Sequence, residues 1–315
     1  MNSACSDQNS LHIPVLKKEV LSCLRIRPNG IYLDGTVGLG GHAQAVLAAL
    51  SNKGQLIGLD SDGEAIKRCH SRLSHASSCH LFHGSYSNFP VHLESLGICE
   101  VDGMFLDLGL SSFQLDSPQR GFSYRQDGPL DMRFDVTAPL TAEGIVNDWN
   151  EDDLVQILQK YGEERRAKRL VKAIIEKRGG SAVRTTLDLR SIISEVTPER
   201  YLTKTLSRVF QALRITVNRE LESLQQFLAL FSSYLKLGGR IVIISYHSLE
   251  DRLVKARFRQ LQKGCICPPD LPQCRCGKQP ELGIITRKVI RPGADEIAHN
   301  SRARSARLRA AEKTG

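Results

Sequence analysis

The sequence lacks any apolar run of the roughly 20 residues that a membrane-spanning helix requires, so it contains no predicted transmembrane segment. Its first ten residues are polar and hold no apolar core, and we therefore expect no secretory signal peptide. No internal repeat of the solenoid type is visible. Most of the nine cysteines stand alone rather than in a disulfide framework, which favours a cytoplasmic location.

The length and charge of the chain set broad expectations for its organisation and partners. Because 315 residues exceed the usual size of one compact domain, we expect two domains or one domain with an insert. Lys and Arg number 43 against 34 Asp and Glu, which gives a net charge of +9. A basic excess of this size fits a polyanionic partner, although a merely basic soluble protein would show it too.

Short apolar runs alternate with helical stretches in the first third of the chain. The runs cover 31–33, 55–59, 79–83 and 101–106, and three of them end in Asp34, Asp60 and Asp107. Strands that alternate with helices imply crossover connections and a parallel sheet. We therefore predict an α/β fold whose ligands bind beyond the carboxyl ends of its strands.

This alternation breaks after the fourth predicted strand. Residues 111–139 are rich in Gly, Pro, Asp and Ser, and from 141 to about 213 apolar residues recur at helical spacing. We predict an inserted, mainly helical, substrate-binding subdomain over 116–213, between two parts of the α/β domain at 1–115 and 214–315. In the last part we expect a helix over 218–234 closed by Gly238 and Gly239, strands over 240–245 and 284–290, and an exposed basic tail from 301.

A glycine-rich loop follows the first predicted strand and precedes a helix. It reads Asp34-Gly35-Thr36-Val37-Gly38-Leu39-Gly40-Gly41-His42, and its glycines let the backbone turn tightly and approach a ligand closely. Asp60, at the end of the next strand, is placed to accept both hydroxyls of a ribose. This combination favours an adenosine-containing cofactor, with NAD and a tight turn that binds nothing as the alternatives.

Two carboxylates favour S-adenosylmethionine over NAD. Asp34 lies directly before the glycines, where it can reach the amino-acid part of that cofactor, and the loop lacks a compact pyrophosphate turn after the strand. Asp107 ends the fourth strand at the same edge of the sheet, where it would lie near the reacting groups. The alternative for Asp107 is a cap of a loop or helix.

Further motifs follow one another in order along nearly the whole chain. They are His12–Leu16, Asp34–His42, Leu106–Asp116, Arg120–Ser123, Asp127–Arg133, Tyr161–Arg165, Phe210–Ile215 with Asn218 and Glu220, Ser245–Arg252, and Asn300–Ser305. This set resembles the MraW/RsmH family, the bacterial 16S rRNA cytosine-N4 methyltransferases. The resemblance implies a class I S-adenosylmethionine-dependent methyltransferase fold, Rossmann-like with a mostly parallel sheet and an inserted helical subdomain, that acts on 16S rRNA in the small ribosomal subunit.

The resemblance also implies roles for single residues. It implies that the cofactor contacts Gly40, Gly41 and His42, that its ribose meets Asp60 and its adenine Tyr86, and that Asp107 and Gln114 lie around its pocket. The exocyclic N4 of cytosine is a poor nucleophile because its lone pair is delocalised into the ring. We predict that Asp107 or a carbonyl of its loop accepts a hydrogen bond from N4 of an extruded cytosine. His247 would accept the proton or bind the base, and a structural role is its alternative.

The cations of the insert are candidates for binding RNA phosphates, and a merely solvated helix face is the equal alternative. They are Arg165, Arg166, Lys168, Arg169, Lys172, Lys177 and Arg178, and the tail adds Arg302, Arg304, Arg307 and Arg309. Cys265, Cys267, Cys274 and Cys276 either bind zinc or are free thiols, and their one-residue inner spacing favours thiols.

Several alternatives for the activity and assembly stay open at this point. The sequence leaves a homodimer open. A methyltransferase for DNA, protein or a small molecule, an NAD-dependent oxidoreductase and a non-catalytic RNA-binding module are the alternative activities.

Overall fold

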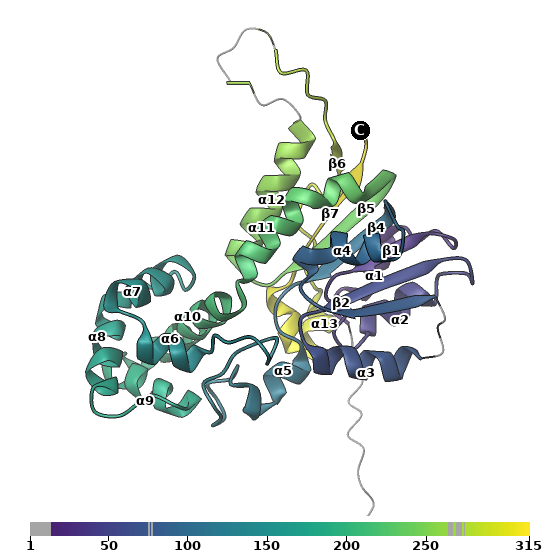
Figure 1. Ribbon diagram of the computed structural model, residues 1–315. Helices are drawn as coiled ribbons and strands as arrows, with labels where there is room; N and C mark the ends of the chain where they lie inside the picture. The colour runs from purple at the N-terminus through teal and green to yellow at the C-terminus, as the bar shows by residue number, and fades with distance from the viewer. Residues whose placement is uncertain (1–13, 75, 77, 264–266, 269–272, 274) are drawn as a thin grey trace, which may run out of the picture.

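One twisted sheet forms the centre of the molecule (Figure 1). The computed structural model describes residues 14–74, 76, 78–263, 267–268, 273 and 275–315. Its seven-stranded sheet has the order β3-β2-β1-β4-β5-β7-β6. The strands are β1 (Ile31–Asp34), β2 (Gln55–Asp60), β3 (Cys79–His83), β4 (Val101–Asp107), β5 (Leu235–Ser245), β6 (Leu282–Ile284) and β7 (Arg307–Lys313). Strands β1 to β5 are parallel and β7 is antiparallel to both neighbours, which confirms the predicted α/β class with a mostly parallel sheet.

Helices cover both faces of this sheet. Successive residues of a strand point to opposite faces, so β5 sends Ile241 and Ile243 into one core and Val242 and Ile244 into another. The first core contains α4 (Phe89–Ser95), α11 (Glu220–Leu230) and α12 (Ser248–Lys263). The second core contains α1 (Lys17–Leu24), α2 (Gly41–Leu47) and α3 (Gly63–Leu73). Because both faces are covered, the carboxyl ends of the strands are the open edge of the sheet.

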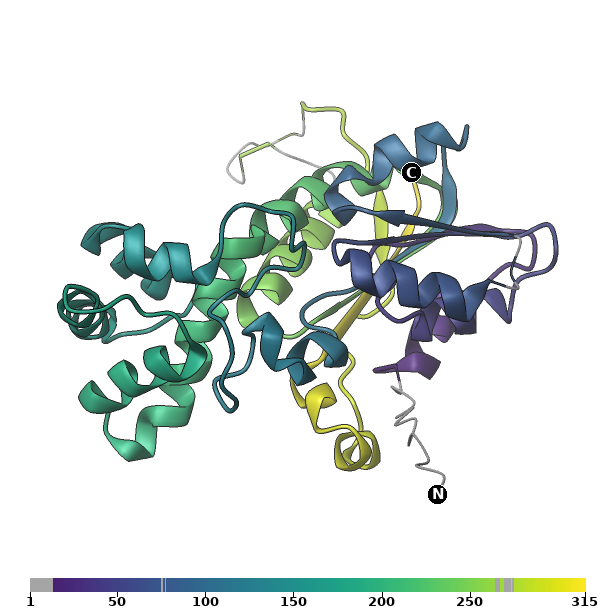
Figure 2. The same cartoon turned by 60° about the horizontal axis from the view of Figure 1, so that its bottom comes forward.

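A separate group of helices follows β4 and has a core of its own. It comprises α6 (Ala142–Asp148), α7 (Glu151–Lys160), α8 (Ala167–Arg178), α9 (Thr186–Val196) and α10 (Glu199–Asn218). Figures 1 and 2 show these helices on one side of the sheet, joined to it by the segment that holds α5 (Ser112–Asp116) and a 3-10 turn, η2 (Pro118–Arg120). Leu154, Ile157, Leu158 and Tyr161, which share one helical face in the sequence, are all buried here. Since α10 runs on to Asn218, we propose that the insert ends there rather than at 213.

The segment before β5 differs from its prediction. Asn218 ends α10, Arg219 takes a left-handed conformation with φ 50°, and α11 then begins at Glu220 and is followed by a 3-10 turn, η3 (Phe231–Tyr234). Gly238 and Gly239 do not cap a helix; they lie inside β5, opposite a register shift in β4. Gly238 has φ +73°, a conformation that suits the bulged residue of a strand, and this explains the glycine.

The prediction of an exposed tail from residue 301 is wrong for residues 307–313, which form a strand. Residues 301–305 form a 3-10 turn, η4, after α13 (Ala294–His299), and β7 then inserts between β5 and β6. Leu308, Ala310 and Ala311 of β7 are fully buried. The late strand is β6 at 282–284 rather than 284–290, and Ile290 forms only an isolated bridge to Leu308. Within the described residues, no helix is long and apolar enough to cross a membrane.

Candidate active site

A cavity of about 410 Å³ opens at the carboxyl ends of β1, β2, β4 and β5. Of the predicted site residues, Gly41, His42, Asp60, Tyr86, Asp107 and Gln114 line it. Asp34, Gly40 and His247 lie behind this lining, in direct contact with the loops that form it. Most of the predicted site residues therefore meet at the carboxyl ends of the parallel strands, where ligands of such sheets bind.

The glycine-rich loop is held against the ends of two strands by backbone hydrogen bonds. Gly35 N donates to Phe105 O at 2.9 Å and Val37 N donates to Leu59 O at 2.8 Å. A Cβ on Gly35 would lie 2.4 Å from a methyl of Leu106 and 2.8 Å from Cβ of Tyr86, so a larger residue would force these side chains to shift. Gly40 is the N-cap residue of α2 and has φ +81°, and a Cβ on it would lie 2.9 Å from Cys69 Sγ. The glycines thus bring the backbone close to the strands and leave the cavity open.

Asp34 is a buried carboxylate behind this loop. Thr36 N donates to its Oδ1 at 3.1 Å, whereas Oδ2 has no hydrogen-bond partner among the described residues. The pKa of Asp34 is raised from 3.8 to about 8, mainly by burial and also by the neighbouring carboxylates of Asp107 and Asp60, while the hydrogen bond from Thr36 N lowers it. Such a group is stabilised in its charged form only when a cation or a donor approaches it.

Asp60 orders the end of β2. Its two oxygens accept hydrogen bonds from Gly38 N and Asp62 N, both at 2.8 Å, and burial raises its pKa to about 6. Asp62 in turn caps α3 and accepts from Gln114 Nε2 at 3.0 Å and from Arg120 Nη1 at 2.7 Å. Gln114 and Arg120 belong to the segment that leads into the insert. The turn at Asp60 is therefore tied to the start of the insert by a buried ion pair.

Asp107 meets a tyrosine from the neighbouring strand end. Tyr246 Oη, just after β5, donates to Asp107 Oδ1 at 2.8 Å, and His42 Nε2 lies 3.7 Å from Asp107 Oδ2. Burial raises the pKa of Asp107 to about 7, while the hydrogen bond from Tyr246 lowers it and the charge of Glu250 raises it. A carboxyl with a pKa near neutrality can gain and lose a proton under working conditions.

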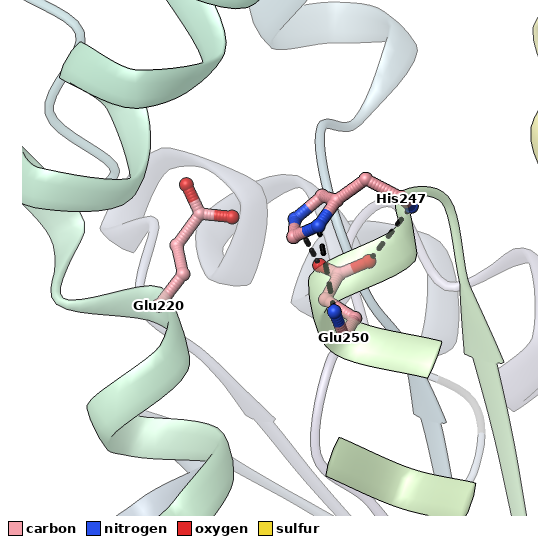
Figure 3. Close-up of side chains that lie close together, drawn as sticks. All are labelled: Glu220, His247 and Glu250. Carbon is pink, nitrogen blue, oxygen red and sulfur yellow. Dashed lines mark hydrogen bonds and ion pairs between the residues drawn. The ribbon is translucent and has the colours of Figure 1, made fainter. Parts of the chain in front are cut away.

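His247 does not line the cavity but supports a neighbour that does. Its Nε2 lies 3.2 Å from Oε1 of Glu250, and the other oxygen of Glu250 accepts from the backbone N of Tyr246 at 2.8 Å and of His247 at 3.3 Å (Figure 3). Although burial opposes it, the charges of His247 and Arg214 lower the pKa of Glu250. Glu250 therefore stays ionised and fixes the backbone that carries Tyr246.

Glu220 completes a group of three potential metal ligands with His247 and Glu250. One ligand atom from each lies within 4.8 Å of the others (Figure 3). Arg214, however, donates to both oxygens of Glu220, at 2.8 and 2.9 Å, and also adds its charge beside Glu250. Two buried carboxylates thus already face one guanidinium and one imidazole. We propose no metal site here, because the positive charges that these acids need are present.

The predicted RNA-binding cations fall into two groups. On and before α8, six of the seven cations are exposed, while Arg178 donates to Val146 O at 2.7 Å. Exposure fits both an RNA-binding face and a solvated helix face, so RNA binding by these cations stays a prediction. In the tail, Arg309 binds both oxygens of Asp251, Arg307 lies 3.6 Å from the same carboxylate, and Arg302 pairs with Asp116. Arg307 and Arg309 thus lie paired in a strand, so the prediction of an exposed basic tail is wrong for residues 307–313, whereas Arg304 in the preceding turn is exposed. Of the four cysteines, Cys265 and Cys274 lie outside the described residues, and the choice between zinc and thiols stays a prediction.

Sequence reasoning missed the supporting residues Thr36, Arg120, Arg214 and Glu250. Thr36 Oγ1, for example, accepts from Asp107 N at 2.6 Å and so joins the loops after β1 and β4. Glu250 and Arg214 lie in motifs that carried the family resemblance, which was the available signal. The charge of Arg214 acts on Glu250 from 36 positions away in the sequence, a relation that spacing alone does not predict.

Comparisons with known proteins show the family of the chain. A model of the MraW methylase family matches residues 9–314. The ribosomal RNA small subunit methyltransferase H of Halothermothrix orenii is 48% identical over 305 residues, which span 96% of this chain and 98% of that protein. The protein of the same name from Caldicellulosiruptor bescii is 47% identical over 303 residues, or 96% and 99% of the two chains. An rRNA methylase from Streptococcus thermophilus, known from its crystal structure, is 12% identical to this chain, and the match covers 95% of this chain and 94% of that one with a TM-score of 0.39.

Proposed function

The chain belongs to the MraW methylase family, and from this premise we propose that it methylates N4 of one cytosine in the RNA of the small ribosomal subunit. It is a methyltransferase with the class I, Rossmann-like fold, and it uses S-adenosylmethionine and acts on small-subunit ribosomal RNA. An NAD-dependent oxidoreductase, a DNA methyltransferase and a non-catalytic RNA-binding module are not favoured. The choice of cytosine N4 rests on the family resemblance.

One observation supports the cofactor most directly: three carboxylates surround or back one cavity, and none of them pairs with a described lysine or arginine. Among the described residues, Asp34, Asp60 and Asp107 form no ion pair with a lysine or arginine, and burial raises the pKa of each. S-adenosylmethionine carries a positive sulfonium and an ammonium group, which would favour the ionised carboxylates. The volume of about 410 Å³ lies within the usual range of about 300–1,000 Å³ for small-molecule sites.

We assign the cofactor contacts to residues of the loops around this cavity. Asp34 would accept hydrogen bonds from the amino-acid end of the cofactor, and Asp60 would accept them from the ribose hydroxyls. Tyr86 would lie against the adenine. The backbone at Gly40, Gly41 and His42 approaches closely because the glycines leave room, and Gln114 braces the wall through Asp62. When bound, the cofactor supplies a methyl group on a positively charged sulfur that leaves readily.

The chain's own contribution to catalysis is to orient the base and to hold the ionised carboxylate of Asp107 where it can take the proton that N4 loses. We propose that Asp107 accepts a hydrogen bond from N4 and thereby localises the nitrogen lone pair. Tyr246 holds the carboxylate of Asp107 in place through the 2.8 Å hydrogen bond. Since His247 reaches the cavity only through Glu250, we propose that it is a positioning residue. The cytosine must leave its stack to reach this depth.

The substrate is proposed to be the RNA within the small ribosomal subunit, gripped in part by the exposed cations on and before α8. Cytoplasmic location and a homodimer stay predictions. Neither is needed for the chemistry argued above.

Methyl transfer onto small subunits from cells that lack the enzyme tests the proposal. Labelled S-adenosylmethionine should place one methyl group per subunit, and nucleoside analysis should find N4-methylcytidine. Asp107→Ala should reduce turnover by at least about a hundredfold while the affinity for the subunit stays unchanged. Label on another base, on another cytosine atom or on protein would refute the proposal. Unchanged turnover of Asp107→Ala would refute the role of Asp107 alone.

A further inference from the structure

A second, smaller cleft lies between α12 and the last two strands, away from the cofactor cavity. It has a volume of about 170 Å³ and is lined by Lys255, Arg259, Arg287, Arg309, Thr286 and Phe258, among others. Three separate segments contribute its cations: α12, the chain after β6, and β7. The lining residues include no acidic side chain.

Three of these four cations have no counter-ion within the described part of the chain. Lys255, Arg259 and Arg287 are exposed, and no ion pair or side-chain hydrogen bond between described residues involves them. Lys255 and Arg259 are four residues apart on one helix, a spacing at which like charges repel and destabilise the helix. Such an arrangement is unfavourable unless an anion neutralises it.

The acid that would neutralise Lys255 is already engaged. Asp251 lies four residues before Lys255 on α12, the spacing of a helical ion pair. Its two oxygens instead accept from Arg309, at 2.6 and 3.1 Å, and lie near Arg307 at 3.6 Å. Arg309 is therefore fixed at the wall of the cleft, and the three exposed cations remain available.

The position of the cleft relates it to the active site. Glu250, in the first turn of α12, lines the cofactor cavity. At 1.5 Å of rise per residue, Lys255 and Arg259 lie about 8 and 14 Å further along the helix axis. Figure 1 shows α12 running from the region where the insert meets the sheet towards β6. A nucleic-acid strand whose target base enters the cavity could place a nearby phosphate at this distance.

We propose that this cleft binds a backbone phosphate of the substrate RNA, within a few nucleotides of the methylated base. Arginine and lysine side chains that converge from three segments match the charge and the several oxygens of a phosphate. The proposal rests on the proposed function, because it takes small-subunit RNA as the ligand. The site differs from the cations of α8, which lie in the insert.

The test compares two double variants that remove the same charge. Lys255→Gln with Arg259→Gln changes the cleft, and Arg25→Gln with Lys53→Gln changes exposed, unpaired cations at the amino end of the strands. Binding to small subunits lacking the modification is measured by filter retention over a range of salt. The cleft variant should raise Kd about three- to tenfold at moderate salt and reduce the slope of log Kd against log salt, while the control should match the wild type.

Other measurements separate the possible failures. S-adenosylmethionine affinity of the cleft variant should equal that of the wild type, because the cavity is unchanged. Its thermal stability should be no lower than that of the wild type, because the buried face of α12 is unchanged and the repulsion between the two cations is removed. Equal Kd and salt slope for the cleft variant and the wild type would refute the cleft. So would binding of inorganic phosphate that depends on Lys255 and Arg259 while subunit affinity does not. Failure of the wild type to methylate small subunits would instead refute the proposed function.

Discussion

Replacing Tyr246 with Phe should move the pH dependence of methyl transfer upwards by about one to two pH units. Tyr246 Oη donates to Asp107 at 2.8 Å, and this bond lowers the pKa of a carboxyl that burial holds at about 7. A hydrogen bond to a charged group contributes about 1.5–3 kcal/mol, and one pKa unit corresponds to about 1.4 kcal/mol. Loss of the donor should therefore raise the pKa of Asp107 to between about 8 and 9.

The sign of the effect follows from the form of Asp107 that works. An ionised carboxylate accepts from N4, whereas a protonated one has lost part of that capacity, so the rate rises with pH through the pKa of Asp107. The wild type should reach half of its maximal kcat/KM near pH 7, and the variant at the higher pH. Near pH 7 the variant should be about five- to fiftyfold slower, and the two rates should converge above about pH 10.

The assay is kcat/KM for the small subunit against pH at saturating S-adenosylmethionine, so that the pH dependence of cofactor binding does not contribute. Tyr86→Phe is the matched control, since it also removes a hydroxyl from the cavity wall, but one that donates to the carbonyl of Glu220 at 3.4 Å. Its pH profile should keep the wild-type midpoint. An unchanged midpoint in Tyr246→Phe, or an equal change in Tyr86→Phe, would refute the reasoning.

The raised carboxyl pKa values lead to two further predictions. Binding of S-adenosylmethionine should tighten as the pH rises from 6 to 8 and release protons, because a cation favours ionised Asp34, Asp60 and Asp107, whose pKa values are about 8, 6 and 7. Calorimetry in buffers of different ionisation enthalpy measures the affinity and the number of protons released. An affinity that does not depend on pH would contradict the prediction. The cofactor-free protein should lose stability as the pH rises from about 4 to 8, because folded Asp34 retains a proton that the unfolded chain releases. In urea unfolding, Asp34→Asn should remove up to about 1.4 kcal/mol of this loss per pH unit. An equal slope of unfolding free energy against pH in both proteins would count against a buried, protonated Asp34.

The strand-end carboxylates were predictable because parallel topology brings the carboxyl ends of strands to one edge. Asp34, Asp60 and Asp107 each end a recognisable apolar run, so their convergence needs only the sheet. The geometry of His247 was not predictable, because it depends on Glu250, whose two oxygens face an imidazole and two backbone amides. Such contacts are set by rotamers and packing rather than by spacing.

The C-terminal strand shows a different reason for failure. Arg307-Leu308-Arg309 begins as an alternation, but two alanines and two charged residues follow, so the apolar signal of β7 is weak. Burial becomes favourable only because Asp251 on α12 neutralises Arg309 and Arg307. That partner lies more than 50 positions away in the sequence, and it converts an apparent basic tail into an inner strand of the sheet.

Helix α12 separates two ligands of opposite charge. Its first turn presents Glu250 to a cavity backed by carboxylates, which suits a cationic cofactor. About two turns further on, Lys255 and Arg259 face a cleft without acids, which suits an RNA phosphate. Asp251, between the two, is neutralised by β7 and therefore disturbs neither side. With the carboxylate-backed cavity near one end and the basic cleft further along, the charge pattern of one helix suits an RNA whose phosphate binds in the cleft while its uncharged base enters beside the cofactor.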